Sequence, residues 1–198
     1  RQDPSAPAGA SVLAAARAVH GGDAPMAAAR ARPAELTWSG FELLAPAAGA
    51  ERRLIAAFGE QWIRERVRAL AGYDALVGRV YALGGEPTAP FTADDAAALG
   101  RLVAHHQSLR VLAVTRNAGA ATSAAALNEL LARRANAAAA PAAGGAPAPG
   151  TPVMMIRNDY DRGLFNGDQG VVARAARPGA PPFLAAVFPR PGGLVAFA

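Results

Sequence analysis

Four polar residues of this chain follow short apolar runs or lie in the loop between them: Arg116, Arg157, Asn158 and Asn166. Arginine carries a fixed positive charge, and the asparagine amide both donates and accepts hydrogen bonds. Side chains of these types contact the phosphates and sugars of nucleic acids. The formal net charge of +5 is compatible with such a partner. We therefore expect these residues to contact a nucleic acid. The alternative is that Arg157 and Asn158 only close a hairpin.

The segment 151–172 has the pattern of a β-hairpin that presents three of these residues. Its apolar residues 153–156 predict a short strand, which ends at the polar residues that follow. The dipeptide Asn166-Gly167 precedes the next extended run and favours a type I′ turn, which needs positive φ at both central positions. The sequence therefore predicts a hairpin or tight β-corner with the polar residues on its loop.

Two carboxylates and one phenylalanine of this hairpin have other expected roles. Asp159 and Asp168 would repel phosphate, so we expect them to cap the turn and to orient Arg157 or backbone N–H groups. Phe165 belongs to an apolar Leu-Phe pair, which favours a place in the core. The alternative for Phe165 is stacking on a base, a contact worth about 1–3 kcal/mol in single-strand binders.

Arg116 follows the run 109–115, which is short, branched and apolar and predicts a buried strand of a parallel sheet. Ligands of open α/β sheets bind beyond the carboxyl ends of strands, where Arg116 would lie.

Periodicity and turn residues predict the other helices and strands. The predicted helices are 12–20 with Ser11 as cap and Gly21-Gly22 at its end, 51–71, 73–83 ended by Gly84-Gly85, one from Thr92 with Asp95 to about Gln107, and one capped by Thr122 or Ser123. The remaining strand candidates are 35–44, as a strand or as a hairpin with a turn at Ser39-Gly40, and 171–175, 183–188 and 194–197.

Composition narrows the classes of function. The chain has no cysteine, which excludes disulfides and thiolate metal sites, and no apolar run approaches the roughly eighteen residues of a membrane span.

Adjacent His105 and His106 would point about 100° apart on a helix, so we expect surface or cap roles for them. A phosphate-binding loop requires G-x-x-x-x-G-K-[ST], and this chain contains no lysine. Residues 137–150 are rich in alanine, proline and glycine and predict a linker.

Residues 157–171, with the pattern R-N-D-x-x-x-G-L-F-N-G-D-x-G-V, resemble the RecD family. Members of this family are alpha subunits of exodeoxyribonuclease V and superfamily 1 DNA helicases. A weaker similarity covers Arg116, Gly119 and the Leu-Asn pair at 127–128, although this chain lacks the second glycine usual there. The resemblance implies an α/β fold. Its parts would be a partial RecA-like motor domain with a helical insertion at 1–136, the linker 137–150, and an incomplete SH3-like β insert at 151–198.

The same resemblance implies a fragment of an ATP-dependent 5′-to-3′ DNA helicase that acts in the cytoplasm, in double-strand break repair by recombination. The chain begins at Arg1 rather than Met, and Arg1 would be the arginine that contacts the γ-phosphate of ATP; the alternative is that Arg1 is an arginine of a terminal loop. ATP and Mg²⁺ would serve the intact enzyme, and we expect the isolated chain to be inactive. Single-stranded DNA and RecB- and RecC-like subunits would be its partners. Two alternatives stay open: another superfamily 1 helicase, or a non-catalytic SH3-like module that binds nucleic acid or protein.

Overall fold

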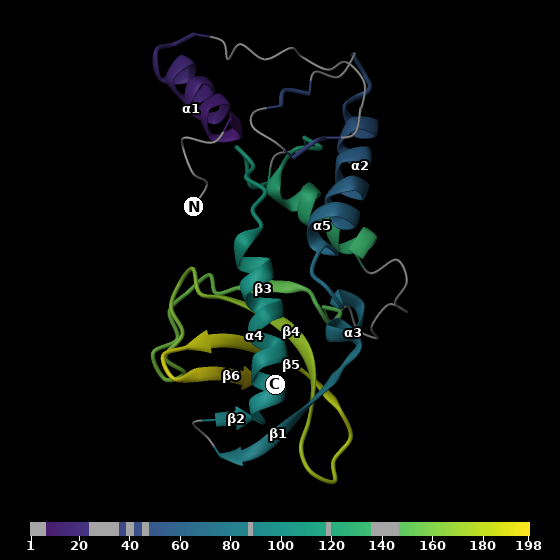
Figure 1. The fold of residues 1–198 in the computed structure, drawn as a ribbon, viewed down its shortest axis with the longest axis vertical. Helices are drawn as coiled ribbons and strands as arrows, with labels where there is room; N and C mark the ends of the chain where they lie inside the picture. The colour runs from purple at the N-terminus through teal and green to yellow at the C-terminus, as the bar shows by residue number, and fades with distance from the viewer. Residues whose placement is uncertain are drawn as a thin grey trace. The chain divides into compact units, whose positions relative to one another are not determined.

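The computed structural model describes residues 7–23, 36–38, 42–44, 48–86, 89–117, 120–135 and 147–198. Helices and a mixed six-stranded sheet give the chain an α/β fold at this coarse level (Figure 1). The chain forms two compact units: a helical unit of residues 1–62 and 114–130, and a sheet unit of residues 63–113 and 131–198. The candidate Arg1 and the Ser39-Gly40 turn lie outside the described residues. Among the helices that are described, none combines the length and the apolar character needed to cross a bilayer.

The helical unit contains α1 (Pro7–His20), α2 (Glu51–Trp62) and the first part of α5 (Ala124–Ala135). Helix α1 ends at the predicted glycine pair. The N–H of Asp23 donates to the Ala18 carbonyl at 2.8 Å, and Gly22 has a φ of 83°. A left-handed glycine with this bond is a Schellman end. The predicted cap at Ser11 is wrong, because the helix already begins at Pro7, whose fixed φ suits a first helical position.

Helix α2 continues into a π-helical turn, η1 (Ile63–Val67), which belongs to the sheet unit. The N–H of Arg68 donates to the Ile63 carbonyl at 2.9 Å, five residues back, as this type of turn requires. The predicted helix 51–71 is therefore helical as far as Val67, and turns and a bend replace its last residues.

The sheet unit is built around β4 (Gln169–Ala176), which pairs with three other strands. The other strands are β1 (Val80–Glu86), β2 (Ala89–Phe91), β3 (Pro152–Met154), β5 (Phe183–Arg190) and β6 (Gly193–Phe197). Their order is β2-β1-β4-β5-β6, and β3 pairs with β4 beside β1. Strand β1 runs parallel to β4, whereas β3 and β5 run antiparallel to it. The predicted strands in 171–175, 183–188 and 194–197 are confirmed, with turns at Gly179 and Gly192 between them.

Helix α4 (Ala93–Ser108) packs against this sheet (Figure 1). Its buried apolar residues recur at three- and four-residue steps: Ala98, Leu99, Leu102 and Val103. The predicted cap is confirmed, because the Thr92 hydroxyl accepts the Asp95 N–H at 3.3 Å. The buried Asp95 carboxylate accepts the Ala82 N–H at 2.9 Å and pairs with Arg79 at 2.5 Å. These bonds fix the start of α4 to strand β1.

The predicted helix 73–83 is wrong in its second half. Helix α3 (Tyr73–Gly78) is short, and β1 takes the remaining residues. Tyr81 is 1% exposed, and its hydroxyl donates to the Leu76 carbonyl at 2.7 Å. Pairing with β4 and burial of this ring favour an extended backbone over the local helical pattern. The glycines 84–85, expected to end a helix, lie inside the strand.

The run 109–115 is not a strand, which overturns the prediction of a buried one. It is coil with a bend at Val114, and the Leu112 and Val114 side chains are 90% and 103% exposed. The Arg110 guanidinium holds its start by donating to the Gln169 side chain at 2.5 Å. A strand needs a neighbouring edge to pair with. Within the described residues, no strand pairs with this run.

Residues 147–150, at the end of the expected linker, belong to the packed sheet unit. The Gly150 N–H donates to the Val172 carbonyl at 2.7 Å. Gly150 has a φ of 82°, and a Cβ there would lie 2.8 Å from Val77. The linker residues 136–146 lie outside the described residues. Strands β1 and β2 precede the linker in sequence yet complete the sheet, so 151–198 is not the separate β unit that we expected.

Candidate nucleic-acid interface

The loop 155–168 connects β3 to β4 and is held by bonds among its own residues. Met155 and the end of the loop exchange two backbone bonds, with Asp168 at 2.9 Å and Gly167 at 2.8 Å. Further along, Asp159 and Leu164 exchange bonds of 2.7 and 2.8 Å. These four bonds confirm the predicted hairpin. They also give the backbone of the loop a defined shape through its own residues.

The turn at Asn166-Gly167 is confirmed, but it is not of type I′. The Asp168 N–H donates to the Phe165 carbonyl at 2.9 Å, which closes a four-residue turn. Gly167 has a φ of 93°, whereas Asn166 is not among the described residues with positive φ. Positive φ at the second central position alone is the pattern of a type II turn. A type I′ turn is favoured where a two-residue loop joins two paired strands directly. The loop here has fourteen residues, so its turn does not have to meet that requirement.

The carboxylates of the loop cap its backbone, as predicted, but they pair with different arginines. Asp159 accepts both the N–H of Arg162, at 3.1 Å, and its guanidinium, at 2.7 Å. These bonds lower the pKa of the Asp159 carboxyl. Asp168 accepts the Phe165 N–H at 2.7 Å, which lowers its pKa, and it pairs with Arg190 at 3.0 Å. Of the two roles expected for these acids, the contact with backbone N–H groups is confirmed, and among the described residues neither acid contacts Arg157.

Arg157 is exposed and is available to a ligand. Within the part of the chain that the structure describes, no hydrogen bond or ion pair holds its guanidinium. Arg162 lies nearby in sequence but is occupied by Asp159. The loop therefore presents one uncommitted cation at the end of β3.

The side chain of Asn158 is committed inside the loop. Its Oδ1 accepts the Asn166 N–H at 2.8 Å, and its Nδ2 donates to the Tyr160 hydroxyl at 3.0 Å. Both ends of the amide are thus engaged. Asn158 shapes the loop, and its amide is not free for the phosphate and sugar contacts that we expected of it. The Asn166 side chain is exposed.

Two aromatic rings of the loop face solvent. Tyr160 was not among the candidate residues, and Phe165 was considered for stacking only as the alternative to a core position. Tyr160 is 76% exposed and Phe165 is 48% exposed, so the core position expected for Phe165 is wrong. Their ring centroids lie 6.2 Å apart, with planes inclined by 77°. Tyr160 stands between Asn158-Asp159 and Asp161-Arg162 with no apolar neighbour. That polar flank was a usable signal of an exposed ring.

Arg116 belongs to the helical unit. It is exposed, and its carbonyl accepts the Ala125 N–H at 3.1 Å, while the Thr115 carbonyl accepts the Ala124 N–H at 2.9 Å. The predicted cap of the next helix is confirmed, because the Ser123 hydroxyl accepts the Ala126 N–H at 3.3 Å. Arg116 therefore lies at the start of α5 rather than beyond a strand. A face shared by Arg116 and Arg157 stays a prediction.

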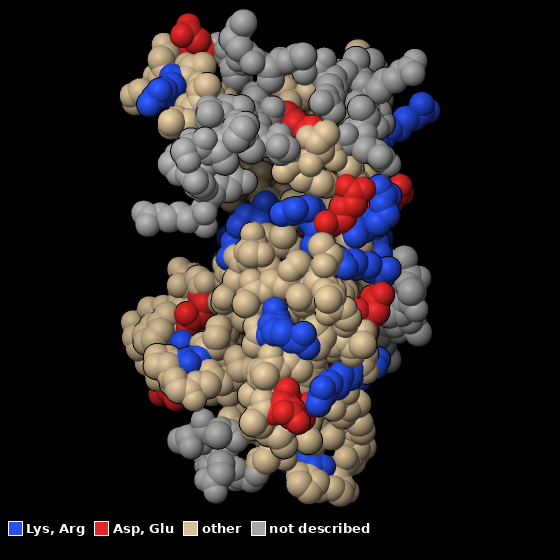
Figure 2. Space-filling model, in the orientation of Figure 1, with Lys and Arg blue, Asp and Glu red and all other residues tan. Residues whose placement is uncertain are grey.

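Charges of both signs are interspersed over the sheet unit on the face drawn in Figure 2. In and beside the loop the charged residues are Arg157, Arg162 and Arg190, and Asp159, Asp161 and Asp168. Three cations and three anions cancel formally. The loop therefore carries little net charge, and a phosphate backbone would meet one local cation rather than a broad positive field.

The histidine pair near the end of α4 is half-buried, so the expected surface position is wrong. His105 Nε2 lies 2.8 Å from the Val67 carbonyl, and His106 Nε2 lies 3.4 Å from the Tyr73 hydroxyl. Burial lowers the pKa of His106 to about 4 and raises that of Tyr73 to about 12. Among the described residues, no three potential metal ligands of the His, Asp and Glu types gather. The two rings pack α4 against α3 and η1.

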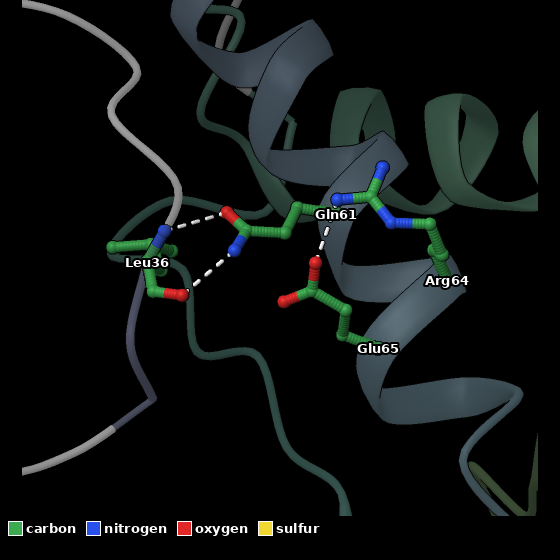
Figure 3. Close-up of polar contacts among 4 residues, drawn as sticks. All are labelled: Leu36, Gln61, Arg64 and Glu65. Atoms are coloured by element: carbon green, nitrogen blue, oxygen red, sulfur yellow. Dashed lines mark hydrogen bonds and ion pairs between the residues drawn. The ribbon is translucent and has the colours of Figure 1, made fainter.

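A second set of polar contacts surrounds Gln61 of α2 (Figure 3). Its amide accepts the Leu36 N–H at 2.8 Å and donates to the Leu36 carbonyl at 2.7 Å. The two amide bonds resemble the backbone bonds between paired strands and attach residues 36–38 to α2, so we assign them a structural role.

Figure 3 also draws the Arg64–Glu65 ion pair of η1, at 2.6 Å. Three aromatic rings pack together in the helical unit: Trp38, Phe58 and Trp62.

Comparisons with known proteins add no assignment. No protein-family model matches this chain, and neither a curated protein nor a solved structure matches it. A function for this chain is therefore inferred from the chemistry of the loop 155–168 and from the motif at 157–171.

Proposed function

We propose that this chain is part of a RecD-like ATP-dependent DNA helicase and that the loop 155–168 contacts the phosphates of single-stranded DNA. The observation that carries this proposal is Arg157, which is exposed and uncommitted while the neighbouring carboxylates are occupied by other groups. A free guanidinium forms charge-assisted hydrogen bonds with a phosphate. The motif at 157–171 supplies the link to helicases.

In the intact enzyme, ATP and Mg²⁺ would drive movement along the strand, and RecB- and RecC-like subunits would complete the assembly. The chain contains no lysine, so it contains no phosphate-binding loop of the G-x-x-x-x-G-K-[ST] type. We therefore expect the 198-residue chain alone to hydrolyse no ATP with or without DNA, as measured by phosphate release. DNA-stimulated hydrolysis by the purified chain would contradict this assignment.

The DNA contact is tested by the affinity of the 198-residue chain for oligo-dT at several salt concentrations. Each phosphate contact contributes about 0.7 to the slope of log K against log salt for a single strand. We expect Arg157→Ala to weaken binding and to reduce the slope by about this amount. Arg116→Ala has the same expected effect if that residue shares the DNA-binding face.

Arg177→Ala is the matched control, because it removes the same charge from the sheet unit. Arg177 follows the far end of β4, and the eight residues of that strand span about 26 Å. This variant should keep the slope of the parent protein. The contact is refuted if Arg157→Ala remains folded and keeps both the parent affinity and the parent slope.

The topology of the sheet unit favours a second candidate, a non-catalytic module that binds nucleic acid or protein. Strands from both sides of the linker build one sheet around α4, as in a binding domain with its own core. The two candidates are separated by the sequence of the full gene. A phosphate-binding loop upstream and a His-Lys-Ser-Gln-Gly motif downstream would support the helicase, either RecD-like or another member of superfamily 1.

A further inference from the structure

The charge balance of the loop limits what phosphates alone can contribute to binding. Arg157 is the one cation of the loop without an internal partner among the described residues, and the exposed Asp161 opposes it. One phosphate contact on a locally neutral surface gives weak binding, with a salt slope of only about 0.7. A useful grip on a strand therefore requires a second kind of contact on the same surface. The exposed rings of Tyr160 and Phe165 supply one.

The geometry of these rings defines how they can be used. Tyr160 and Phe165 already meet edge to face, with planes inclined by 77°. No base can be inserted between them, so a base can stack only on a ring face that the other ring does not cover. The guanidinium of Arg190 also lies over the Phe165 ring, at 6.0 Å from its centroid. Tyr160 therefore has the more accessible face and Phe165 supports it.

The rings are held in place before any ligand arrives. The Tyr160 hydroxyl accepts a bond from Asn158 at 3.0 Å, and the Phe165 N–H is bonded to Asp168 at 2.7 Å. Asp168 in turn pairs with Arg190, whose side chain is 18% exposed. An aromatic ring fixed in its binding position loses little conformational entropy on binding. Such preorganisation is expected of a binding surface, whereas an exposed ring without a role needs no such anchors.

We propose that unpaired bases stack on Tyr160, with Phe165 as its support and Asn158 as the residue that positions it. The inference rests on the proposed function, since it places the strand on the same loop, and it defines the ligand as a strand with accessible bases. In a duplex each internal base is covered on both faces by its neighbours, so a ring on the protein surface cannot reach it. The loop thereby distinguishes single strands from duplexes without reading sequence.

Stacking is tested by comparing oligo-dT with an abasic strand of the same length and charge. We expect the 198-residue chain to bind the abasic strand roughly tenfold more weakly, the effect of losing one stacking contact. Tyr160→Ala should weaken oligo-dT binding by a similar factor and leave abasic binding unchanged, whereas Tyr160→Phe keeps the ring and most of the affinity. A 2-aminopurine base in the strand reports stacking through its fluorescence, which should change on binding to the parent and not to Tyr160→Ala.

The positioning role of Asn158 is tested with a double-mutant cycle. Asn158→Ala should weaken oligo-dT binding in the parent protein and do so less in the Tyr160→Phe background, where the hydroxyl is already absent. Equal losses in both backgrounds would overturn this role. Ile156→Ala, a change to another exposed apolar residue of the loop, serves as the control for lost surface area.

The outcomes separate this inference from the proposed function. If oligo-dT and abasic strands bind equally well and Arg157→Ala reduces the salt slope, the DNA contact stands and stacking is refuted. If neither strand binds at low salt, the proposed function itself fails. Binding of duplex as tight as that of oligo-dT would also refute stacking.

Discussion

The loop 155–168 and the run 109–115 are held in different ways. The loop closes on itself through backbone bonds, two carboxylate caps and one amide, all supplied by residues within it. Among the described residues, the run is attached near its ends, by Arg110 at its start and by the Thr115 carbonyl at its end. Its residues 111–114 form no backbone hydrogen bond with another described residue. A polar loop can thus satisfy its own backbone, whereas a strand-like segment depends on a neighbour.

This difference predicts where substitutions matter. In the sheet unit, positions with complete packing should be sensitive, and the run between α4 and α5 should be tolerant. Four changes test this expectation, and each is measured as the free energy of unfolding by chemical denaturation followed by circular dichroism. They are given from the largest expected effect to the smallest.

Leu99→Ala should be the most damaging. Leu99 is 0% exposed in the middle of the α4 stripe that covers the sheet. Its truncation removes buried methyl groups and leaves a cavity, at about 3–4 kcal/mol. A loss below about 1 kcal/mol would show that α4 does not form the core of the sheet unit.

His106 makes stability depend on pH at the point where α4 meets the run. Its pKa is about 4 in the folded protein against 6.5 for the free group. The unfolded chain therefore binds more protons between these values, and stability should fall as the pH drops from 6.5 to 4, by about 3 kcal/mol in total. His106→Gln should remove most of this decline, and His20→Gln, at the exposed end of α1, should leave it unchanged. A parent protein with flat stability over this range would contradict the burial of His106.

Gly170→Ala tests the join between the loop and β4. An added Cβ would lie 2.3 Å from the Val187 carbonyl and 2.9 Å from the Phe188 ring. Since backbone cannot yield as a flexible side chain does, we expect destabilisation of about 2 kcal/mol. Gly100→Ala is the matched control: its Cβ meets nothing within 4 Å, and alanine favours the helix by about 1 kcal/mol. Equal stabilities of the two variants would refute the close contact.

Leu112→Ala should have the smallest effect. Leu112 is 90% exposed, so its truncation removes almost no buried surface and should change stability by less than about 0.5 kcal/mol. It is the counterpart of Leu99→Ala, with the same chemical change at the opposite extreme of burial. A loss comparable to that of Leu99→Ala would mean that the run is packed as a strand after all.

The sequence predicted the features that are determined within a few residues. The cap at Thr92, the glycine end of α1, the hairpin and the strands β4 to β6 all follow from local patterns that the structure confirms. Of the candidate interface, it predicted the exposed Arg157 and the capping role of the two aspartates. The specific RecA-like and SH3-like architectures stay predictions.

The features it missed depend on distant partners. Val80 and Tyr81 continue the helical periodicity of the preceding residues, but pairing with β4 places them in a strand. Residues 109–115 have strand composition but no described partner strand. In each case the deciding contact lies outside the window in which a sequence pattern is read.

The parallel pairing of β1 with β4 has a consequence for how the chain folds. Val80 pairs with Arg174, so a contact closes across a separation of 94 residues, 174 less 80. The β4–β5–β6 meander, by contrast, joins neighbours through short turns. Contacts between distant residues form slowly, because the entropy of closing the loop is lost before the contact stabilises the chain. During synthesis the edge of β1 that pairs with β4 must remain unpaired until β4 has left the ribosome, and in that interval its unpaired backbone N–H and C=O groups and apolar side chains are open to aggregation.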